Sequence, residues 1–380
     1  MEGTRESCSS WIRRPENRVL VIVGRPRTGA FQSLLEVFSF DAKTASLSAA
    51  PLAMCSLGEG DADPLGFSVH PNGEEIVCST NKGCKLFELS DRDLSYKLVV
   101  KDLPPLESAG MQNCLAFSTD GSRFASGGQD GHLRILEWPS LKVLVDEPKA
   151  HKSFHDMDIS LDSEFLVSTS TDGSARIWKI NDGAPLISLT RQADEKIECC
   201  RFSRDGMKPF LFCTVLKGGK VVTAVWDIST WNRIGFKRLL RKPVSVLSIS
   251  LDGKYLALGS NDGDMCVVDV KKMEICHWSK KLHLGSSISS IEFCPSERVV
   301  ISTSNQWGPV ITKLNVPADW KEWQLYLLLV ALFLCSAVIF YFFYEHSDSF
   351  WNFPLGRNQP RPHFRNIIPD SQLADDQSPW

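Results

Sequence analysis

The sequence predicts an all-β fold, a seven-bladed β-propeller, followed by a single C-terminal transmembrane helix. Two observations carry this prediction. A pattern of strands and turns recurs with a period of about 40–45 residues, which is typical of propeller blades. Near the end of the chain, the 22 residues from Trp323 to Tyr344 contain no charge. At about 1.5 Å per residue, a helix of that length just crosses a hydrocarbon core of about 30 Å.

The recurring pattern lies between residues 60 and 315 and occurs six times. Each copy has an apolar start, a turn, an apolar strand, a second turn and another strand. The copies start at Phe67, Phe117, Ile159, Phe202, Ile249 and Phe293. Asp-Gly pairs, which favour tight hairpin turns, begin at positions 120, 130, 172, 205, 252 and 262. Six copies predict six blades.

The segment from Val19 to Phe40 supplies the seventh blade. It has two apolar runs joined by a loop that contains Gly and Arg, which predicts two strands. About 320 residues at some 44 per blade also gives seven blades. We further consider that this segment lends a strand to the last blade, because that would close the ring and remove exposed sheet edges.

Two of the copies resemble WD repeats. In one of them His151, Asp172 and Trp178 match the repeat's His, turn Asp and strand Trp, and a hydroxyl is available among residues 168–170. In such repeats these groups bond to one another and fix the blade, so we interpret them as structural rather than as a catalytic His/Asp/Ser set. His155 lies four residues after His151, but in a loop entering a strand, so no metal is expected.

Motifs for chemistry are missing from the sequence. It has no Walker, G-x-S-x-G, H-E-x-x-H or kinase pattern, so no catalytic residue and no cofactor is expected. The 42 Lys+Arg against 45 Asp+Glu argue against nucleic acid as a partner. The basic run from Asn232 to Lys242 could face anionic lipid or an acidic partner, although a solvated edge strand and loop is the simpler interpretation. A propeller of this kind usually presents its surfaces to other proteins.

The uncharged stretch has aromatic residues suited to both membrane interfaces: Trp320 and Trp323 at its start, and Tyr341 and Tyr344 at its end. The alternative, a buried helix of a soluble core, rarely runs so long without a charge. The sequence therefore predicts a single-pass membrane protein.

Cysteine usage and the N-terminus set the expected orientation. The 12 cysteines are scattered, match no zinc spacing and mostly lie in apolar runs, which favours free thiols in a reducing compartment. The N-terminus has no apolar signal region. We therefore expect a cytosolic propeller (residues 1–315), a juxtamembrane linker (316–322), the transmembrane helix (323–344) and a short, mostly disordered lumenal tail (345–380).

Nearly the whole chain resembles the endoplasmic-reticulum family that includes the exchange factor for the Sar-type GTPase, which starts COPII coat assembly. It is most similar to the plant branch of SEC12-like WD-repeat membrane proteins called phosphate transporter traffic facilitators. The strings that carry the resemblance include CSSWIRRPEN from Cys8, DEPKAHKS from Asp146, DSEFLVSTSTDGSARIWK from Asp162, KPFLFC from Lys208, VPADWKEWQLY from Val316 and SDSFW from Ser347. The resemblance implies location in the endoplasmic-reticulum membrane.

The resemblance breaks down in the first blade. Active exchange factors of the family have a glycine-rich loop, G-G-G-G…G-I-x-N, that binds potassium and reaches into the GTPase's nucleotide site. The corresponding loop here, VGRPRTGAFQSLLEV, keeps only Gly24 and Gly29, has Arg25 after the first glycine, and has no Asn near Ser33. Fewer glycines restrict the turns that carbonyl ligation of an ion requires.

Two functions follow from the resemblance. In the first, a factor without exchange activity promotes exit of plasma-membrane phosphate transporters, or other membrane cargo, from the endoplasmic reticulum. In the alternative, the protein activates the Sar-type small GTPase for COPII vesicle formation. The degenerate loop favours the first. A DNA-binding regulator is disfavoured by the near-neutral charge and the membrane span.

Overall fold

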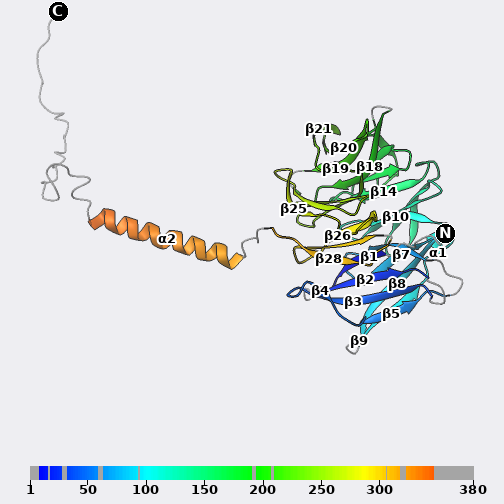
Figure 1. The fold of residues 1–380 in the computed structure, drawn as a ribbon, viewed down its shortest axis with the longest axis horizontal. Coiled ribbons are helices and arrows are strands. Elements are labelled where there is room, and N and C mark those ends of the chain that lie inside the picture. The colour runs from blue at the N-terminus through cyan, green and yellow to red at the C-terminus, as the bar shows by residue number, and fades with distance from the viewer. Residues whose placement is uncertain are drawn as a thin grey trace, which may run out of the picture. The chain divides into compact units, whose positions relative to one another are not determined.

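The chain folds into a propeller of antiparallel sheets and one long helix (Figure 1). It divides into two compact units, Met1–Val316 and Pro317–Trp380. The computed structural model describes residues 8–15, 18–27, 32–58, 63–92, 95–190, 194–206, 209–304, 306–316 and 322–345. The expectations for Gly29, Trp320 and the tail from 346 to 380 lie outside the described residues.

The first three blades come from the N-terminal part of the chain. Blade 1 contains β1 (Cys8–Arg13), β2 (Val19–Arg25), β3 (Leu34–Asp41), β4 (Ser46–Leu47) and β5 (Ala53–Ser56). Blade 2 contains β6 (Pro64–Val69), β7 (Glu75–Thr80), β8 (Cys84–Arg92) and β9 (Ser95–Lys101), and is followed by the short helix α1 (Pro104–Glu107). Blade 3 contains β10 (Gln112–Phe117), β11 (Arg123–Gly128), β12 (Leu133–Glu137) and β13 (Lys142–Glu147).

The other four blades follow in order. Blade 4 contains β14 (Phe154–Ile159), β15 (Phe165–Ser170), β16 (Ala175–Lys179) and β17 (Pro185–Ser188). Blade 5 contains β18 (Glu195–Phe202), β19 (Phe210–Lys217), β20 (Lys220–Asp227) and β21 (Asn232–Lys237). Blade 6 contains β22 (Val244–Ile249), β23 (Tyr255–Ser260), β24 (Met265–Asp269) and β25 (Glu274–Ser279). Blade 7 contains β26 (Ile288–Phe293), β27 (Val299–Ser304) and β28 (Val310–Lys313).

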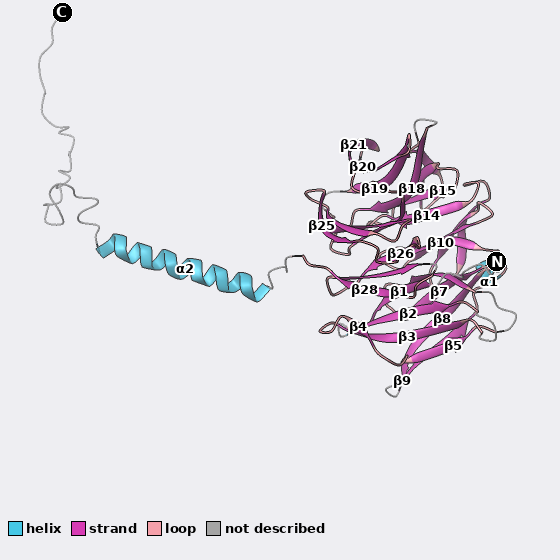
Figure 2. Cartoon of the chain, in the orientation of Figure 1, coloured by secondary structure: helices cyan, strands magenta, loops and turns pink. Residues whose placement is uncertain are grey.

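The seven-bladed propeller is confirmed. Within each blade the strands pair with their sequence neighbours, except that in blade 1 β5 pairs with β3 instead of β4. The first strand of each blade contacts the first strand of the next, and β1 contacts both β6 and β26, so the first strands form a closed ring. Figure 2 shows that the regular secondary structure of this unit is almost entirely strand.

The second strand of each blade is buried on both faces because blades pack on either side of it. In β15 and β27 nearly every residue is buried. The predicted hairpin turns lie before or after these strands: the glycines of five of the six Asp-Gly pairs have positive φ, with Gly131 at 82° and Gly173 at 87°. That conformation is accessible to glycine at little cost.

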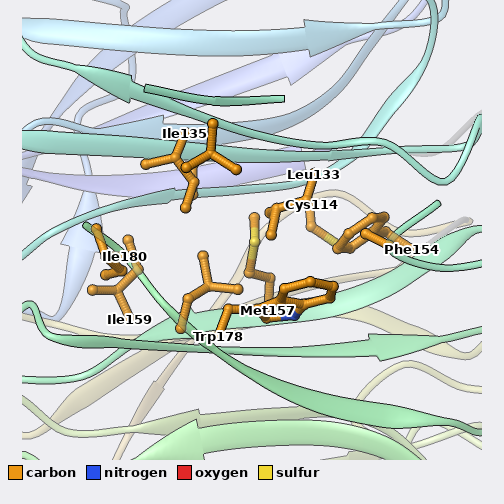
Figure 3. Packing of buried hydrophobic residues seen from close by; sticks show 12 residues of the cluster. Cys114, Leu133, Ile135, Phe154, Met157, Ile159, Trp178 and Ile180 are labelled. Carbon is orange, nitrogen blue, oxygen red and sulfur yellow. The ribbon is translucent and has the colours of Figure 1, made fainter. Parts of the chain in front are cut away.

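Apolar side chains fill the spaces between neighbouring blades. Figure 3 shows one such layer, where Leu133 and Ile135 of blade 3 lie across from Met157 and Trp178 of blade 4. These side chains are at most 5 % exposed, and burying each contributes about 1.5–3 kcal/mol. The ring is therefore held mainly by packing between sheets.

Most of the predicted free thiols belong to this apolar core. All 12 cysteines are free, and nine of them are buried. Burial raises the pKa of Cys84 and of Cys266 to about 12, so both thiols stay protonated near neutral pH. They act as small core side chains.

The ring closes differently from the expectation that the N-terminal segment lends a strand to the last blade. In the described residues blade 7 has three strands, and β1 pairs with β2 in its own sheet. The seam is closed by side chains instead. Glu292 of β26 accepts hydrogen bonds from the Ser10 hydroxyl at 2.9 Å and the Trp11 backbone N–H at 3.1 Å. The Trp11 indole donates to the Glu292 carbonyl at 3.1 Å.

The second unit contains α2 (Glu322–Glu345). Its stretch Trp323–Glu345 is long and apolar enough to cross a membrane. The predicted interface residues Trp323, Tyr341 and Tyr344 are exposed, the first near the beginning of the helix and the other two near its end. The helix fits a single-pass membrane protein.

Candidate functional site

The candidate GTPase-facing loop connects β2 to β3 in blade 1. Gly24 and Arg25 are the last residues of β2, and Ser33 directly precedes β3. The Arg25 Nε lies 2.6 Å from the Glu36 Oε2, and only 9 % of the Glu36 side chain is exposed. This ion pair fixes the start of the loop against its own sheet.

Gly24 has a packing reason to be glycine. A Cβ at this position would lie 2.7 Å from the Cys8 Sγ and 3.0 Å from side-chain atoms of Phe67 and Pro64. Its φ is not in the left-handed region. The missing side chain lets blade 1 approach blade 2, and the residue does not need to serve an ion to explain its identity.

Asp63 joins the two described ends of the loop. Its Oδ1 accepts hydrogen bonds from the Arg27 backbone N–H and the Ser33 hydroxyl, both at 2.7 Å. The Ser33 carbonyl accepts a bond from the Leu57 N–H at 2.9 Å. Since Asp63 immediately precedes β6, these bonds tie the loop to blade 2. Sequence reasoning missed Asp63, and no motif in the sequence marks it.

The WD-type residues of blade 4 lie together. The Ser168 hydroxyl contacts the His151 Nε2 and accepts from the Trp178 indole, both at 2.8 Å. The Ser174 hydroxyl lies 3.4 Å from the His151 Nδ1, and an Asp172 carboxylate oxygen accepts from the Ser174 N–H at 2.9 Å. The chain therefore brings the three predicted residues into one network, with Ser168 at its centre.

Burial sets the protonation of this network. Burial, with a smaller contribution from the charge of Arg176, lowers the pKa of His151 to about 4. Hydrogen bonds from Ser174 and Ser170 lower the pKa of Asp172 against the raising effect of its partial burial. Near neutral pH the imidazole is neutral and the carboxylate is charged. Ser168 and Trp178 are buried and His151 is only 9 % exposed, whereas Asp172 lies at the surface, so a substrate does not easily reach the His–Ser–Trp part of the network.

Blade 7 has a second His–Ser pair that sequence reasoning missed. The His283 Nε2 lies 2.8 Å from the Ser302 hydroxyl, and burial lowers the pKa of His283. A signal was present in the sequence. Each histidine lies 20 residues after a turn glycine (131 to 151 and 263 to 283), and its backbone N–H donates to that glycine's carbonyl at 3.2 Å in both cases.

Carboxylates of blade 4 bind the first strand of blade 5. Asp156 accepts from the Cys200 N–H and lies 2.6 Å from the Arg201 guanidinium, while Asp158 accepts from the Phe202 N–H. Burial alone would lower the pKa of Arg201, but the two carboxylates raise it. These charged groups pair with one another between blades 4 and 5, and we interpret them as structural. Among the described residues no group of three His, Cys, Asp or Glu side chains could hold a metal.

Known proteins are consistent with this architecture. The family model "WD domain, G-beta repeat" matches residues 107–136 and 142–179. The chain is 56 % identical to SEC12-like protein 1 of Arabidopsis thaliana, over 100 % of this chain and 98 % of that protein. It is 31 % identical to SEC12-like protein 2 of the same plant, over 73 % of this chain and 71 % of that protein.

A more distant relative has a named activity. The chain is 25 % identical to the guanine nucleotide-exchange factor SEC12 of Rattus norvegicus, over 61 % of this chain and 54 % of that protein.

Fold and comparisons together define the class, a seven-bladed WD-repeat propeller with one candidate membrane helix. Within that class, the chain belongs to the SEC12-like family. Family membership supports a SEC12-type role in trafficking.

Proposed function

We propose that the protein is a trafficking factor of the endoplasmic-reticulum membrane that promotes exit of plasma-membrane phosphate transporters toward the Golgi, without nucleotide-exchange activity. Its propeller (residues 1–315) faces the cytosol and its tail (345–380) the lumen. Residues 316–322 form a juxtamembrane linker, and Trp320 lies at the membrane interface with Trp323. The resemblance to the plant facilitators supports the cargo, and the 56 % identity to a SEC12-like protein over the whole chain supports the trafficking role.

The first-blade loop is the single observation that carries the absence of exchange activity. Gly24 is accounted for by packing, Arg25 is paired with Glu36, and Ser33 is bound to Asp63. A residue that reaches into a GTPase must be available to leave its own sheet. Each of these three residues is held by contacts within the propeller. Such contacts fit a loop with a structural role better than a loop that enters another protein's nucleotide site.

The propeller then acts by binding. His151, Asp172 and Trp178 hold blade 4 in shape and take no part in a reaction. The cytosolic faces of phosphate transporters or other membrane cargo are the partners, and no metal or cofactor is needed.

The decisive experiment measures nucleotide release. Full-length protein in nanodiscs is added to a Sar-type GTPase loaded with fluorescent GDP, and the rat SEC12 exchange factor is the positive control. We expect release at the intrinsic rate with this protein. Acceleration that is lost in Gly29→Ala and kept in the distant Gly235→Ala would overturn the proposal and establish the exchange-factor alternative.

Cargo selection is measured in a budding reaction from endoplasmic-reticulum membranes that contain a phosphate transporter and an unrelated plasma-membrane protein. Added full-length protein should increase the transporter in the vesicle fraction and leave the unrelated protein unchanged. An equal increase of both would contradict cargo selectivity while leaving a general trafficking role.

A further inference from the structure

The outer edge of blade 5 has an exposed surface that the proposed function does not use. We define the basic edge as Ile234, Phe236, Lys237, Arg238 and Arg241, on β21 and the loop that follows it. Phe236 is 71 % exposed and Ile234 is 56 % exposed. Outside α2, Phe236 is the most exposed large apolar side chain of the described residues. β21 is the outermost strand of its blade, so the predicted edge strand and loop are confirmed.

The charge of this edge opposes that of the whole chain. Residues 232–242 contain five Lys or Arg and no Asp or Glu, whereas the chain carries a net charge of −3. Arg233 and Lys242 have acidic partners, Glu195 and Asp262. Lys237, Arg238 and Arg241 form no ion pair within the described part of the chain. Three unneutralised cations therefore stand beside two exposed apolar side chains.

Packing holds these cations outward. Directly after Arg238, Leu239 and Leu240 turn into the core between blades 5 and 6 and are 7 % and 4 % exposed. Arg241 follows them back to the surface. Because the buried leucine pair anchors the loop, Arg238 and Arg241 cannot fold into the core, and the surface is built into the blade.

An anionic membrane surface matches this chemistry. Cations attract the headgroups of acidic lipids, and aromatic and aliphatic side chains insert at the boundary with the acyl chains. The same chain has a helix long and apolar enough to cross a membrane. We infer that the basic edge of blade 5 docks the propeller on the anionic leaflet of that membrane. This inference rests on the cytosolic orientation in the proposed function, since the cytosolic leaflet carries the acidic lipids.

Pairing with a strand of another protein fits the edge less well. In β21 the register skips Ile234, since Val225 pairs with Gly235 and Trp226 with Arg233. A bulge of this kind, with a lysine on the same strand, is how sheet edges are protected from adding a further strand. The outer strand of blade 2, β9, differs from β21 in its charge. Its exposed Val99 and Val100 lie next to Lys101, but that lysine is neutralised by Glu88 at 2.7 Å.

The test places a photocrosslinker at the surface. Full-length protein with p-benzoylphenylalanine in place of Phe236 is reconstituted in nanodiscs of phosphatidylcholine, alone or mixed with phosphatidylserine. We expect roughly tenfold more lipid adducts in the anionic discs, and fewer at high salt. The same crosslinker in place of Met54, which is 61 % exposed on β5 of blade 1, should give few adducts in either disc.

A charge reversal identifies the cause. Lys237→Glu, Arg238→Glu and Arg241→Glu together should reduce adducts in anionic discs to the level of neutral discs, because they leave the buried leucine pair intact. Lys43→Glu, Lys142→Glu and Lys149→Glu, at exposed positions of blades 1 and 3, should have no such effect. Adducts independent of acidic lipid, or adducts to a second copy of the chain, would overturn the inference. Nanodiscs expose both leaflets, so the result does not depend on topology, cargo or exchange activity.

Discussion

Burial keeps the imidazole of His151 neutral near pH 7 and makes it a pH-sensitive part of blade 4. Its pKa is about 4 in the folded chain, against about 6.5 for an unperturbed histidine. Between these values the unfolded chain binds a proton that the folded chain does not. The contribution of the neutral His151 to the free energy of unfolding is therefore fully present above pH 6.5 and is lost as the pH falls toward 4.

Between pH 7 and pH 5 we expect protonation of His151 in the unfolded chain to lower the free energy of unfolding by about 2 kcal/mol. Denaturant unfolding of wild type and His151→Gln at both pH values measures it. The variant is less stable at pH 7 because Ser168 loses the imidazole as its hydrogen-bond partner. The difference in unfolding free energy between wild type and variant should narrow by about 2 kcal/mol at pH 5. Ser168→Ala removes the same hydrogen bond but keeps the imidazole. The difference in unfolding free energy between this variant and wild type should therefore be nearly the same at both pH values. A constant difference for His151→Gln would contradict the depressed pKa.

At this scale the sequence predicts a residue well when the segment around it resembles a known repeat. His151, Asp172 and Trp178 were predicted because their segment resembles a WD repeat, which has a His, a turn Asp and a strand Trp at these places. Asp63 and Glu292 were missed because each bonds to backbone or hydroxyl groups brought close by folding alone: Glu292 lies 281 positions from Trp11 along the chain. No local pattern encodes such a pairing.

Among the strands, the seam between blades 7 and 1 departs most from expectation. Strand periodicity and turn glycines predicted the blades, since both are local properties. Which strands close the ring depends on the fit of β1 against β26, and the apolar cluster there joins Trp11 and Val21 to Cys294 and Ile301. The choice between a lent strand and side-chain closure is therefore made by tertiary packing.

Glu292 should be important for this seam. Glu292→Ala leaves the Trp11 N–H and the Ser10 hydroxyl without their acceptor, which we expect to cost about 1–3 kcal/mol. Amide hydrogen exchange should accelerate in β1 and β26 before the other blades. Glu292→Gln keeps a carbonyl acceptor and should lose less, and the exposed Glu297→Ala should change little. Uniform acceleration across all blades would mean that the seam is not a local weak point.

The whole molecule combines a seven-bladed propeller with a helix long and apolar enough to cross a membrane. Seven blades bury their second strands on both faces, whereas every described side chain of α2 is exposed. Such a helix is stable only where lipid replaces water around it. The apolar composition of α2 was readable from the sequence because it is a property of a continuous segment.

Membrane anchoring by α2 can be tested by charge at two depths. Arginine at the centre of a spanning helix costs about 2.5–3.5 kcal/mol, whereas near the ends the side chain reaches the interface. Val330→Arg with Leu334→Arg should therefore release the full-length protein from membranes on alkaline extraction. Gln324→Arg with Tyr344→Arg adds the same charge near the ends and should leave it in the pellet. If the central pair also stays in the pellet, α2 is not the anchor, and the basic edge of blade 5 cannot replace it, because alkaline extraction releases proteins held on membranes by surface charge alone.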